Sequence, residues 1–324
     1  MKWSLLFGIS ILAALLLYLD PTKVIEAAKT AEIEYFLIAI GINFLELLFQ
    51  TLRFRSFSSR FKIKDRSFLT HAKIQAVANV STYLAPAKTG HAIKIFLQKK
   101  IMNLEYPKGL SIFFIERFQE FLGVYILLLT IALFIGSKIG FLSRYYIPIS
   151  FLLVIMIGIT VAIIKLNIQP LVNRLTPEKF KGTFNFKSLQ TAIKGNFNYW
   201  LFGKTLLYSL TTPILSIIRL FVVFLAFGMN PDLIILSGVF LISLLIGVVT
   251  FLPGGLGAFE TSAVALYTTG LNYDPVQVGA ALLTLRFFSI AFDSVMGLLA
   301  ARSLEKQEKQ ITAKQMLQLH KADI

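Results

Sequence analysis

Residues 80–97 read VSTYLAPAKTGHAIKIFL, an apolar segment whose middle is a polar turn. The turn and the positions after it hold a helix breaker, a glycine and three potential cations: Pro86, Gly90, Lys88, His91 and Lys94. A second stretch, VVTFLPGGLGAFE at residues 248–260, aligns with the first across a one-residue gap, matching Thr82 with Thr250, Pro86 with Pro253 and Gly90 with Gly257. A polar turn that interrupts an apolar segment twice predicts the broken helices of a transporter-type binding site.

The composition is that of an integral membrane protein. Of the 324 residues, 56% are hydrophobic and only 15% are charged, and the mean hydropathy is +0.72. Soluble domains carry about 25% charged residues. Basic loops that face anionic lipid explain the net charge of +15 better than a nucleic-acid partner does. The chain has no cysteine and its three histidines lack metal-ligand spacing, so we expect neither a metal nor a cofactor.

Hydropathy predicts an all-α polytopic membrane protein with about six full spans. The apolar stretches that carry this prediction are residues 3–19, 35–51, 110–135, 147–164, 205–227 and 275–301. Lysine and arginine gather in the loops 52–73 and 165–204, which marks the cytoplasmic side and places both termini there. We therefore expect a single transmembrane domain over residues 1–301 in the cell membrane and a basic cytoplasmic tail over 302–324.

The loop 165–204 mixes lysines with aromatic and aliphatic residues in the stretch from Phe184 to Trp200. The spacing of Phe186, Leu189 and Ile193 predicts an amphipathic helix on the inner membrane surface. A polar linker with scattered aromatic residues is the alternative, because helical periodicity in a short window is weak support for a helix.

Two segments, 74–97 and 233–270, predict re-entrant or broken-helix elements. Neither half of 74–97 is long enough to span, and basic residues on both sides of it indicate that it enters and leaves at the cytoplasmic face. Residues 233–270 are either a hairpin that enters from outside or one full span and one short one. The hairpin option gives an inverted-topology repeat whose tips meet near the midplane. Unrelated turns of similar sequence are the alternative.

Charged residues also fall within the predicted spans and turns. They are Glu46, Glu116, Arg117, Glu120, Arg219, Glu260, Arg286 and Asp293. A charge at the centre of a membrane helix costs about 2.5–3.5 kcal/mol on the insertion scale, so these side chains should face the interior of the bundle, paired or wet. For any single one of them, ion pairing between helices is the plain alternative to a role in function.

Three blocks of the chain resemble the signature blocks of the lysylphosphatidylglycerol synthase transmembrane-region family, whose members are often called flippase-like. The blocks are PAKTGHAIK from Pro86, IERFQE at 115–120 and LPGGLGAFE at 252–260. The family more often has Gly-Arg-x-Gly-Glu where this chain has Ala87-Lys88-Thr89-Gly90-His91, so Lys88 keeps the positive charge and His91 replaces an acid. The resemblance implies movement of a lipid between leaflets.

In the two-part synthases of that family, a soluble aminoacyltransferase half follows the membrane half. Only about two dozen residues follow the last predicted span, and folded domains need about 50 or more. We therefore expect no aminoacyltransferase activity in this chain, and we expect a transporter and not an enzyme. A separate lipid-modifying enzyme is the partner that this arrangement implies, beside the membrane lipid itself.

The predicted site binds an anionic headgroup or lipid phosphate in a central polar cavity. Arginine and lysine side chains supply phosphate contacts, with Lys88, His91, Lys94, Arg117 and Arg286 as the cationic pocket. Backbone N–H groups of the second turn add anion contacts, and the carboxylates balance charge. The complete predicted set is Pro86, Lys88, Gly90, His91, Lys94, Glu116, Arg117, Glu120, Pro253, Gly254, Gly255, Gly257, Glu260, Arg286 and Asp293.

The sequence favours a flippase-like transporter of a phospholipid or a polyprenyl (isoprenoid) lipid. A membrane-embedded glycosyltransferase-like enzyme that acts on a lipid phosphate is one alternative, although the chain has no D-x-D pair and no long soluble loop for a nucleotide sugar. An ion-coupled transporter of a small anion is another, and a structural membrane scaffold is a third. The absence of a Walker A pattern argues against direct ATP coupling within this chain.

Overall fold

The computed structural model of the chain describes residues 2–63, 66–83, 92–135, 186–196, 198–250 and 252–322, together with a few positions between 150 and 158. In this part of the chain the secondary structure is helical, without a strand, which confirms the all-α prediction. The helices are α1 (Lys2–Tyr18), α2 (Pro21–Lys29), α3 (Ile33–Ser58), α4 (Phe68–Ser81), α5 (Ala92–Met102), α6 (Tyr106–Ile135), α10 (Phe186–Asn196), α11 (Tyr199–Ala226), α12 (Leu233–Val249), the short 3₁₀ turn η4 (Pro253–Gly255), α13 (Ala258–Leu271) and α14 (Pro275–Ala322).

Side-chain caps explain where several of these helices begin. Ser67 accepts the backbone N–H of Thr70 at the start of α4, and Asn198 accepts that of Leu201 at the start of α11. Asp232 accepts two backbone N–H groups at the start of α12. At α2 the backbone and hydroxyl of Thr22 both donate to Asp20, which holds the pKa of that exposed carboxyl below its ordinary value. Each cap satisfies donors that the first helical turn leaves unpaired.

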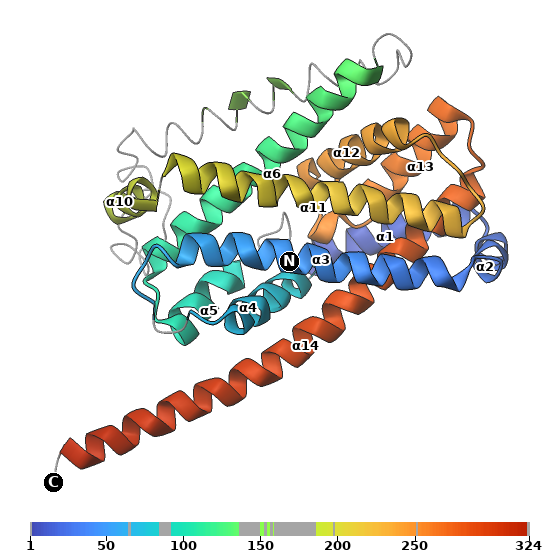
Figure 1. The fold of residues 1–324 in the computed structure, drawn as a ribbon. Helices are drawn as coiled ribbons and strands as arrows, with labels where there is room; N and C mark the ends of the chain where they lie inside the picture. Colours follow the sequence, from blue (N-terminus) through green and yellow to red (C-terminus); the bar gives the residue numbers. More distant parts are fainter. Residues whose placement is uncertain are drawn as a thin grey trace.

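Helices α3 and α11 form the central antiparallel pair, and Figure 1 shows them side by side. Polar contacts run along their interface. Arg53 donates to Ser209 at 3.0 Å, Ser216 donates to Glu46 at 2.7 Å, and Arg219 donates to Asn43. A polar seam between two apolar helices is costly unless each group is satisfied, so the seam fixes the register of this pair.

Helices α12 and α13 form a tight helical hairpin with η4 at its tip. Tyr267 donates to the Leu236 carbonyl at 2.9 Å near the open end, and Gly247 lies against Phe259 near the tip. The tip turns because Gly254 and Gly257 adopt φ of +58° and +82°, a region that side chains with a Cβ rarely enter. The segment 233–270 is therefore two short antiparallel helices in this structure, and its position in a membrane stays a prediction.

Helices α4 and α5 pack against each other, and α4 also lies along α14. The turn between α4 and α5, which contains Pro86 and Gly90, lies outside the described residues. The ends of the two short helices α4 and α12 are alike. Thr82 follows α4 and donates its hydroxyl to the Asn79 carbonyl, and Thr250 follows α12 and donates to the Gly247 carbonyl. The aligned threonines thus end their helices by the same side-chain bond.

Two apolar clusters form the core of the described residues. The larger joins α1–α3 to α11–α14 and includes Phe224, Leu236 and Tyr267. The smaller gathers Phe54, Ile74 and Met102 from α3, α4 and α5, with residues of α6 and α14. On α3, Asn43 and Glu46 of the polar seam lie in sequence between Ala39 of the larger cluster and Leu47 of the smaller one.

Three described helices are long and apolar enough to cross a membrane: Ile33–Ser58, Tyr199–Ala226 and the Pro275–Gln307 part of α14. Helices α1 and α12 are apolar but have only 17 residues each. The chain is therefore a membrane protein by its helices, while the expectation of about six spans stays a prediction. In the basic loop, α10 buries Leu189 and Ile193 and packs against α6, whereas residues 165–185 lie outside the described residues.

Candidate functional site

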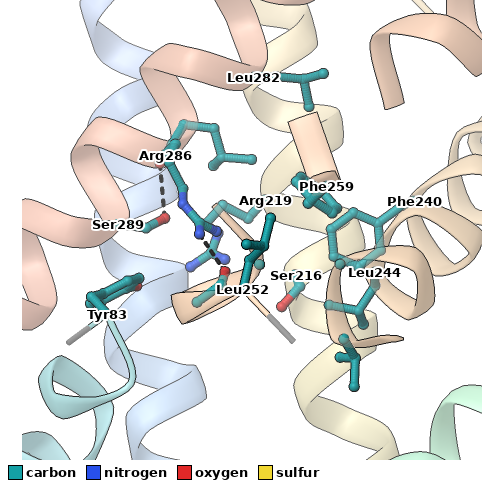
Figure 2. Close-up of a pocket in the computed structure, with 15 residues that line it drawn as sticks. Tyr83, Ser216, Arg219, Phe240, Leu244, Leu252, Phe259, Leu282, Arg286 and Ser289 are labelled. Atoms are coloured by element: carbon teal, nitrogen blue, oxygen red, sulfur yellow. Dashed lines mark hydrogen bonds between the residues drawn. The ribbon is translucent and has the colours of Figure 1, made fainter. Parts of the chain in front are cut away.

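An apolar cavity of about 170 Å³ lies at the tip of the α12–α13 hairpin. Figure 2 shows Arg219, Arg286 and Tyr83 on one side of it and Phe240, Leu244 and Phe259 on the other. The remaining lining residues are Ser216, Gly247, Val248, Leu252, Gly254, Gly255, Leu282, Leu285 and Ser289. Two guanidinium groups therefore border a space whose walls are otherwise mainly hydrocarbon, a combination that suits the junction between a charged group and an apolar chain.

Arg286 is held at this cavity by the turn of the hairpin. It donates to the Gly254 carbonyl, and its Nε lies 3.3 Å from a carboxylate oxygen of Glu260. Glu260 is itself fixed, because its other oxygen accepts the backbone N–H of Gly257 at 2.8 Å at the start of α13. The Arg286 guanidinium also lies 5.6 Å from the ring centre of Tyr83. The turn thus orients an arginine that is only 19% exposed.

A second cavity, also of about 170 Å³, adjoins the first and is polar. Tyr83, Arg219 and Ser289 line both cavities. The other lining residues of the polar cavity are Asn43, Glu46, Leu47, Gln50, Asn79, Thr82 and Asp293. Tyr83 donates to Asp293 at 2.8 Å, so the end of α4 and the middle of α14 close one wall.

Arg219 stands at the boundary between the two cavities. Its Nη1 donates to Asn43 and lies 3.1 Å from Glu46, and Ser216 donates to the other oxygen of Glu46. Its Nε is buried and has no hydrogen-bond partner in the described part of the chain. The guanidinium of Arg219 is therefore not fully satisfied by acceptors of the protein.

A cluster of charged residues lies where α3, α5 and α6 meet, and we call it the α6 charge cluster. Its members are Arg53, Lys94, Glu116, Arg117 and Glu120. Lys94 donates to both oxygens of Glu116, at 2.9 and 2.7 Å, and to Gln75 at 2.8 Å. Arg53 and Arg117 donate to the same oxygen of Glu120, at 2.5 and 2.6 Å. Arg53 and Lys94 are almost fully buried, so the cluster is a closed network of charge-assisted hydrogen bonds.

The outer side of the α6 charge cluster borders a small cavity of about 30 Å³ that Arg117 and Glu120 line. Leu244 and Val248 line this small cavity and the apolar cavity alike. The charge cluster therefore lies next to the apolar cavity, separated from it by side chains of α12, and does not open directly into it.

The structure divides the predicted site residues into two groups. Lys94, Glu116, Arg117 and Glu120 lie in the α6 charge cluster. The second group lies at or behind the two cavities and consists of Pro253, Gly254, Gly255, Gly257, Glu260, Arg286 and Asp293. Pro86, Lys88, Gly90 and His91 lie outside the described residues. The structure thus does not bring Lys94 and Arg117 into one pocket with Arg286, since the first two are engaged by Glu116 and Glu120.

Charge counting also missed residues that the structure brings together. It assigned Arg53 to a cytoplasmic loop, whereas Arg53 is buried within α3 and 1% exposed. The signal was present, because Arg53 follows Glu46 by two helical turns and so shares its face. Neutral polar residues gave no such signal, and the polar cavity draws Asn43, Gln50 and Asn79 from two helices.

The comparisons with known proteins agree on the class of the chain. Two proteins of Methanothermobacter thermautotrophicus, each named UPF0104 membrane protein, are 24% and 25% identical over 91% and 82% of this chain and over 93% and 83% of their own lengths. A protein of Haloferax volcanii named glycosyltransferase AglD is 23% identical over 86% of this chain, which spans half of that protein. The model of the family described as lysylphosphatidylglycerol synthase TM region matches residues 5–297. The chain therefore belongs to the lysylphosphatidylglycerol synthase transmembrane-region family.

Proposed function

We propose that this protein is a flippase-like carrier that moves a lipid phosphate, such as a phospholipid or a polyprenyl phosphate, between the leaflets of the cell membrane. The observation that carries the proposal is the pair of guanidinium groups, Arg219 and Arg286, at the edge of an apolar cavity beside a polar one. The arrangement of a lipid phosphate matches this site, because its phosphate has an apolar chain on one side and a headgroup on the other.

The two arginines offer the chemistry that a phosphate needs. Arginine presents a rigid fork of donors that matches phosphate oxygens, and it stays charged when it is partly buried. The turn before α13 uses its own N–H groups, because Gly255 donates to the Leu252 carbonyl and Gly257 donates to Glu260. The side chains of Arg219 and Arg286 are therefore the donors that remain for an anion. Glu46 and Glu260 hold the empty site near neutrality, which lowers the cost of keeping two cations at membrane depth.

An inverted repeat would supply the movement. The halves are α3–α6 and α11–α14, and three features recur in both. Asn43 and Arg53 are ten residues apart, as are Ser209 and Arg219, and each arginine contacts the polar residue of the other half. These reciprocal contacts are what a two-fold relation between the halves would produce.

The other two features lie at the broken helices. The aligned threonines Thr82 and Thr250 end α4 and α12 by equivalent bonds. The third residue of the next short helix is a buried charge in each half, Lys94 in α5 and Glu260 in α13. Each buried charge forms an ion pair with the long helix that follows it: Lys94 with Glu116, and Glu260 with Arg286. The two halves therefore have equivalent ion pairs in which the positions of the positive and the negative residue are exchanged.

Alternating access follows from this arrangement. The contact in the first half is closed within the α6 charge cluster, while the contact in the second half borders the open cavity. Exchange of these two states would expose the phosphate site first to one leaflet and then to the other. In this topology both termini and the loop 165–204 are cytoplasmic, and residues 74–97 and 233–270 enter the membrane from opposite sides.

The test is translocation of fluorescent lipid in vesicles that contain the purified protein. We expect faster exchange of a lipid phosphate between leaflets than in protein-free vesicles, and loss of that gain in Arg219→Gln and Arg286→Gln. The matched control is Arg302→Gln, because Arg302 is exposed on α14 and contributes to neither cavity. Wild-type protein that fails to speed exchange of any diacyl or polyprenyl lipid phosphate would refute the carrier.

A glycosyltransferase-like enzyme that acts on a lipid phosphate is the second candidate, and the name of the Haloferax volcanii relative favours it. We expect the carrier to act on a lipid that a separate enzyme makes or consumes, and not to transfer a sugar itself. Incubation of purified protein with polyprenyl phosphate and radiolabelled nucleotide sugars separates the two candidates, since labelled lipid would form only with the enzyme.

A further inference from the structure

The polar cavity contains more hydrogen-bonding groups than a phosphate and an apolar chain would use. Apart from Leu47, every residue that lines it has a polar or charged side chain. We propose that this cavity is a headgroup subsite for an uncharged, hydroxyl-rich group, a sugar or a polyol, linked to the phosphate. The proposal rests on the proposed carrier function and names the class of headgroup that the carrier would accept.

The amides of the cavity are oriented by their neighbours. Asn79 donates to the carbonyl oxygen of Gln50 at 2.9 Å, and Gln75 donates to both of them at 2.8 and 3.2 Å. Gln75 is fixed in turn because its own oxygen accepts from Lys94. With its oxygen occupied twice, Gln50 has its NH₂ group left over, and that group has no partner in the described part of the chain. Gln50 is therefore a pre-oriented donor at the cavity wall.

The opposite wall supplies a second donor and the acceptors. The Asn43 oxygen accepts from Arg219, which leaves the Asn43 NH₂ group without a partner among the described residues. Asp293 accepts from Tyr83 and also interacts with the Asn79 side chain, and it keeps further acceptor capacity, since a carboxylate has about four lone-pair sites. Ser289 uses its hydroxyl proton within α14 and can accept as well. A hydroxyl group donates and accepts at once, so a group with several hydroxyls matches this mixture.

The charged side chains at the cavity already have partners within the protein. Glu46 is engaged by Ser216 and Arg219, and Asp293 is engaged by Tyr83. An ammonium group would be attracted by both carboxylates, but it would have to compete with these partners and would face the guanidinium of Arg219 across the same cavity. A free anion would instead meet two carboxylates. An uncharged headgroup is the species that the lining accepts without such repulsion.

The experiment measures lipid binding, so it does not depend on transport. Purified protein in nanodiscs is mixed with two matched series of probes and analysed by native mass spectrometry. The diacyl series is phosphatidic acid, phosphatidylethanolamine and phosphatidylinositol, and the polyprenyl series is polyprenyl phosphate and its glucosyl ester. In at least one series we expect the hydroxyl-rich member to bind about tenfold more tightly than the others, as one or two net hydrogen bonds allow.

Substitutions in the polar cavity should remove the preference for the hydroxyl-rich lipid. They should keep the binding of the lipid phosphate that all the probes share. Gln50→Met and Thr82→Val delete polar groups at similar size, and we expect each to reduce the tenfold preference while lipid phosphate without a headgroup still binds. That retained binding also reports that the variant is folded. Thr269→Val is the matched control, because Thr269 is exposed on α13 and its hydroxyl bonds only within that helix. The control should keep the preference.

Three results would overturn the subsite: equal binding of all members in both series, preference for phosphatidylethanolamine, or no binding in either series. A preference that survives both cavity substitutions would place the headgroup elsewhere and also count against it. The transport function can be disproved independently of the headgroup subsite. If wild-type protein selects the hydroxyl-rich lipid but does not speed its exchange between leaflets, the subsite stands and the transport function falls.

Discussion

Lys94 is a cation buried within the protein, with both oxygens of Glu116 and the Gln75 oxygen as its hydrogen-bond acceptors. We predict that Lys94→Met lowers the free energy of unfolding by about 3–5 kcal/mol, because it leaves the Glu116 carboxylate buried without its main partner. Adding Glu116→Gln should recover a large part of this loss, since removal of both charges removes the unpaired one. Titration with a denaturing detergent, followed by circular dichroism, measures the difference.

The control for that pair is Lys99→Met, on the same helix but partly exposed, which should change stability by less than about 0.5 kcal/mol. A loss of the same size in Lys94→Met and Lys99→Met would contradict the buried pair. So would a double variant that is less stable than Lys94→Met, because Glu116 would then stabilise the fold through a partner other than Lys94, such as Arg53 at 3.9 Å.

Gly254 combines a positive φ of 58° with close neighbours. A Cβ at this position would lie 2.9 Å from the Tyr83 ring and 3.2 Å from the Arg286 guanidinium. We predict that Gly254→Ala destabilises the protein by about 1–3 kcal/mol, from backbone strain and overpacking together. It should also weaken lipid-phosphate binding, because the displaced side chains line the apolar cavity. A thermal-shift measurement in detergent tests the first effect, and native mass spectrometry tests the second.

The matched control is Gly203→Ala in the helix α11, where a Cβ would meet nothing within 4 Å. A helical glycine costs about 0.5–1 kcal/mol relative to alanine, so this variant should be as stable as wild type or more stable. Equal destabilisation at the two glycines would show that the turn at Gly254 is not specially constrained.

The α12–α13 hairpin makes a prediction about topology that hydropathy alone could not make. Because the chain has no cysteine, single cysteines report their own accessibility. Asn230→Cys and Asn272→Cys flank the open end of the hairpin and should react with a membrane-impermeant maleimide from one side, opposite to Ser59→Cys after α3. Thr250→Cys at the tip should react from neither side, because the tip of a hairpin lies at membrane depth. Reaction of Thr250→Cys from the side of Ser59→Cys would instead indicate two separate spans.

The boundaries of several helices could be predicted from the sequence, because they depend on residues close to them in the chain. The boundaries of the second broken element were predicted at 233–270 and lie at Leu233 and Leu271, because Asp232 caps one end and the apolar run stops at the other. The helix α6 begins four residues before the predicted 110, since Pro107 fits the first helical turn and does not end the helix. Local capping and composition determine such boundaries.

The contacts of the candidate site were not readable in the same way. Arg53 was assigned to a loop because lysines and arginines follow it, and the residues that bury it, Ser209 and Glu120, are far away in sequence. Gln50 and Asn79 carry no charge and gave no signal, although they form part of a cavity wall. Contacts between helices depend on how the helices are aligned along one another in three dimensions. That alignment cannot be predicted from a single sequence without homologues.

The molecule as a whole places two similar charged contacts in different environments. Lys94–Glu116 is sealed among α3, α4, α5 and α6, whereas Glu260–Arg286 borders a cavity. If the halves α3–α6 and α11–α14 are an inverted repeat, the difference between these contacts defines one of two states, and exchange of states requires the halves to move relative to each other. One place where such movement can be blocked is the contact of α4 with α14, which joins the two halves, as the α3–α11 pair also does.

Val80 on α4 and Gly297 on α14 meet at this contact, and a Cβ on Gly297 would lie 3.0 Å from the Val80 Cβ. Disulfides span Cβ atoms about 3.5–4.5 Å apart, so the double variant Val80→Cys/Gly297→Cys should form a bond after a shift of a few tenths of an ångström. We predict that oxidation of this variant in vesicles lowers lipid exchange to the rate of protein-free vesicles, while lipid binding in nanodiscs is kept. A reducing agent should restore exchange.

Because the wild-type chain has no cysteine, the same oxidation should leave it unaffected. Full exchange in the oxidised variant, with the disulfide verified by mass spectrometry, would mean that lipid crosses without relative movement of α4 and α14, as along a fixed groove.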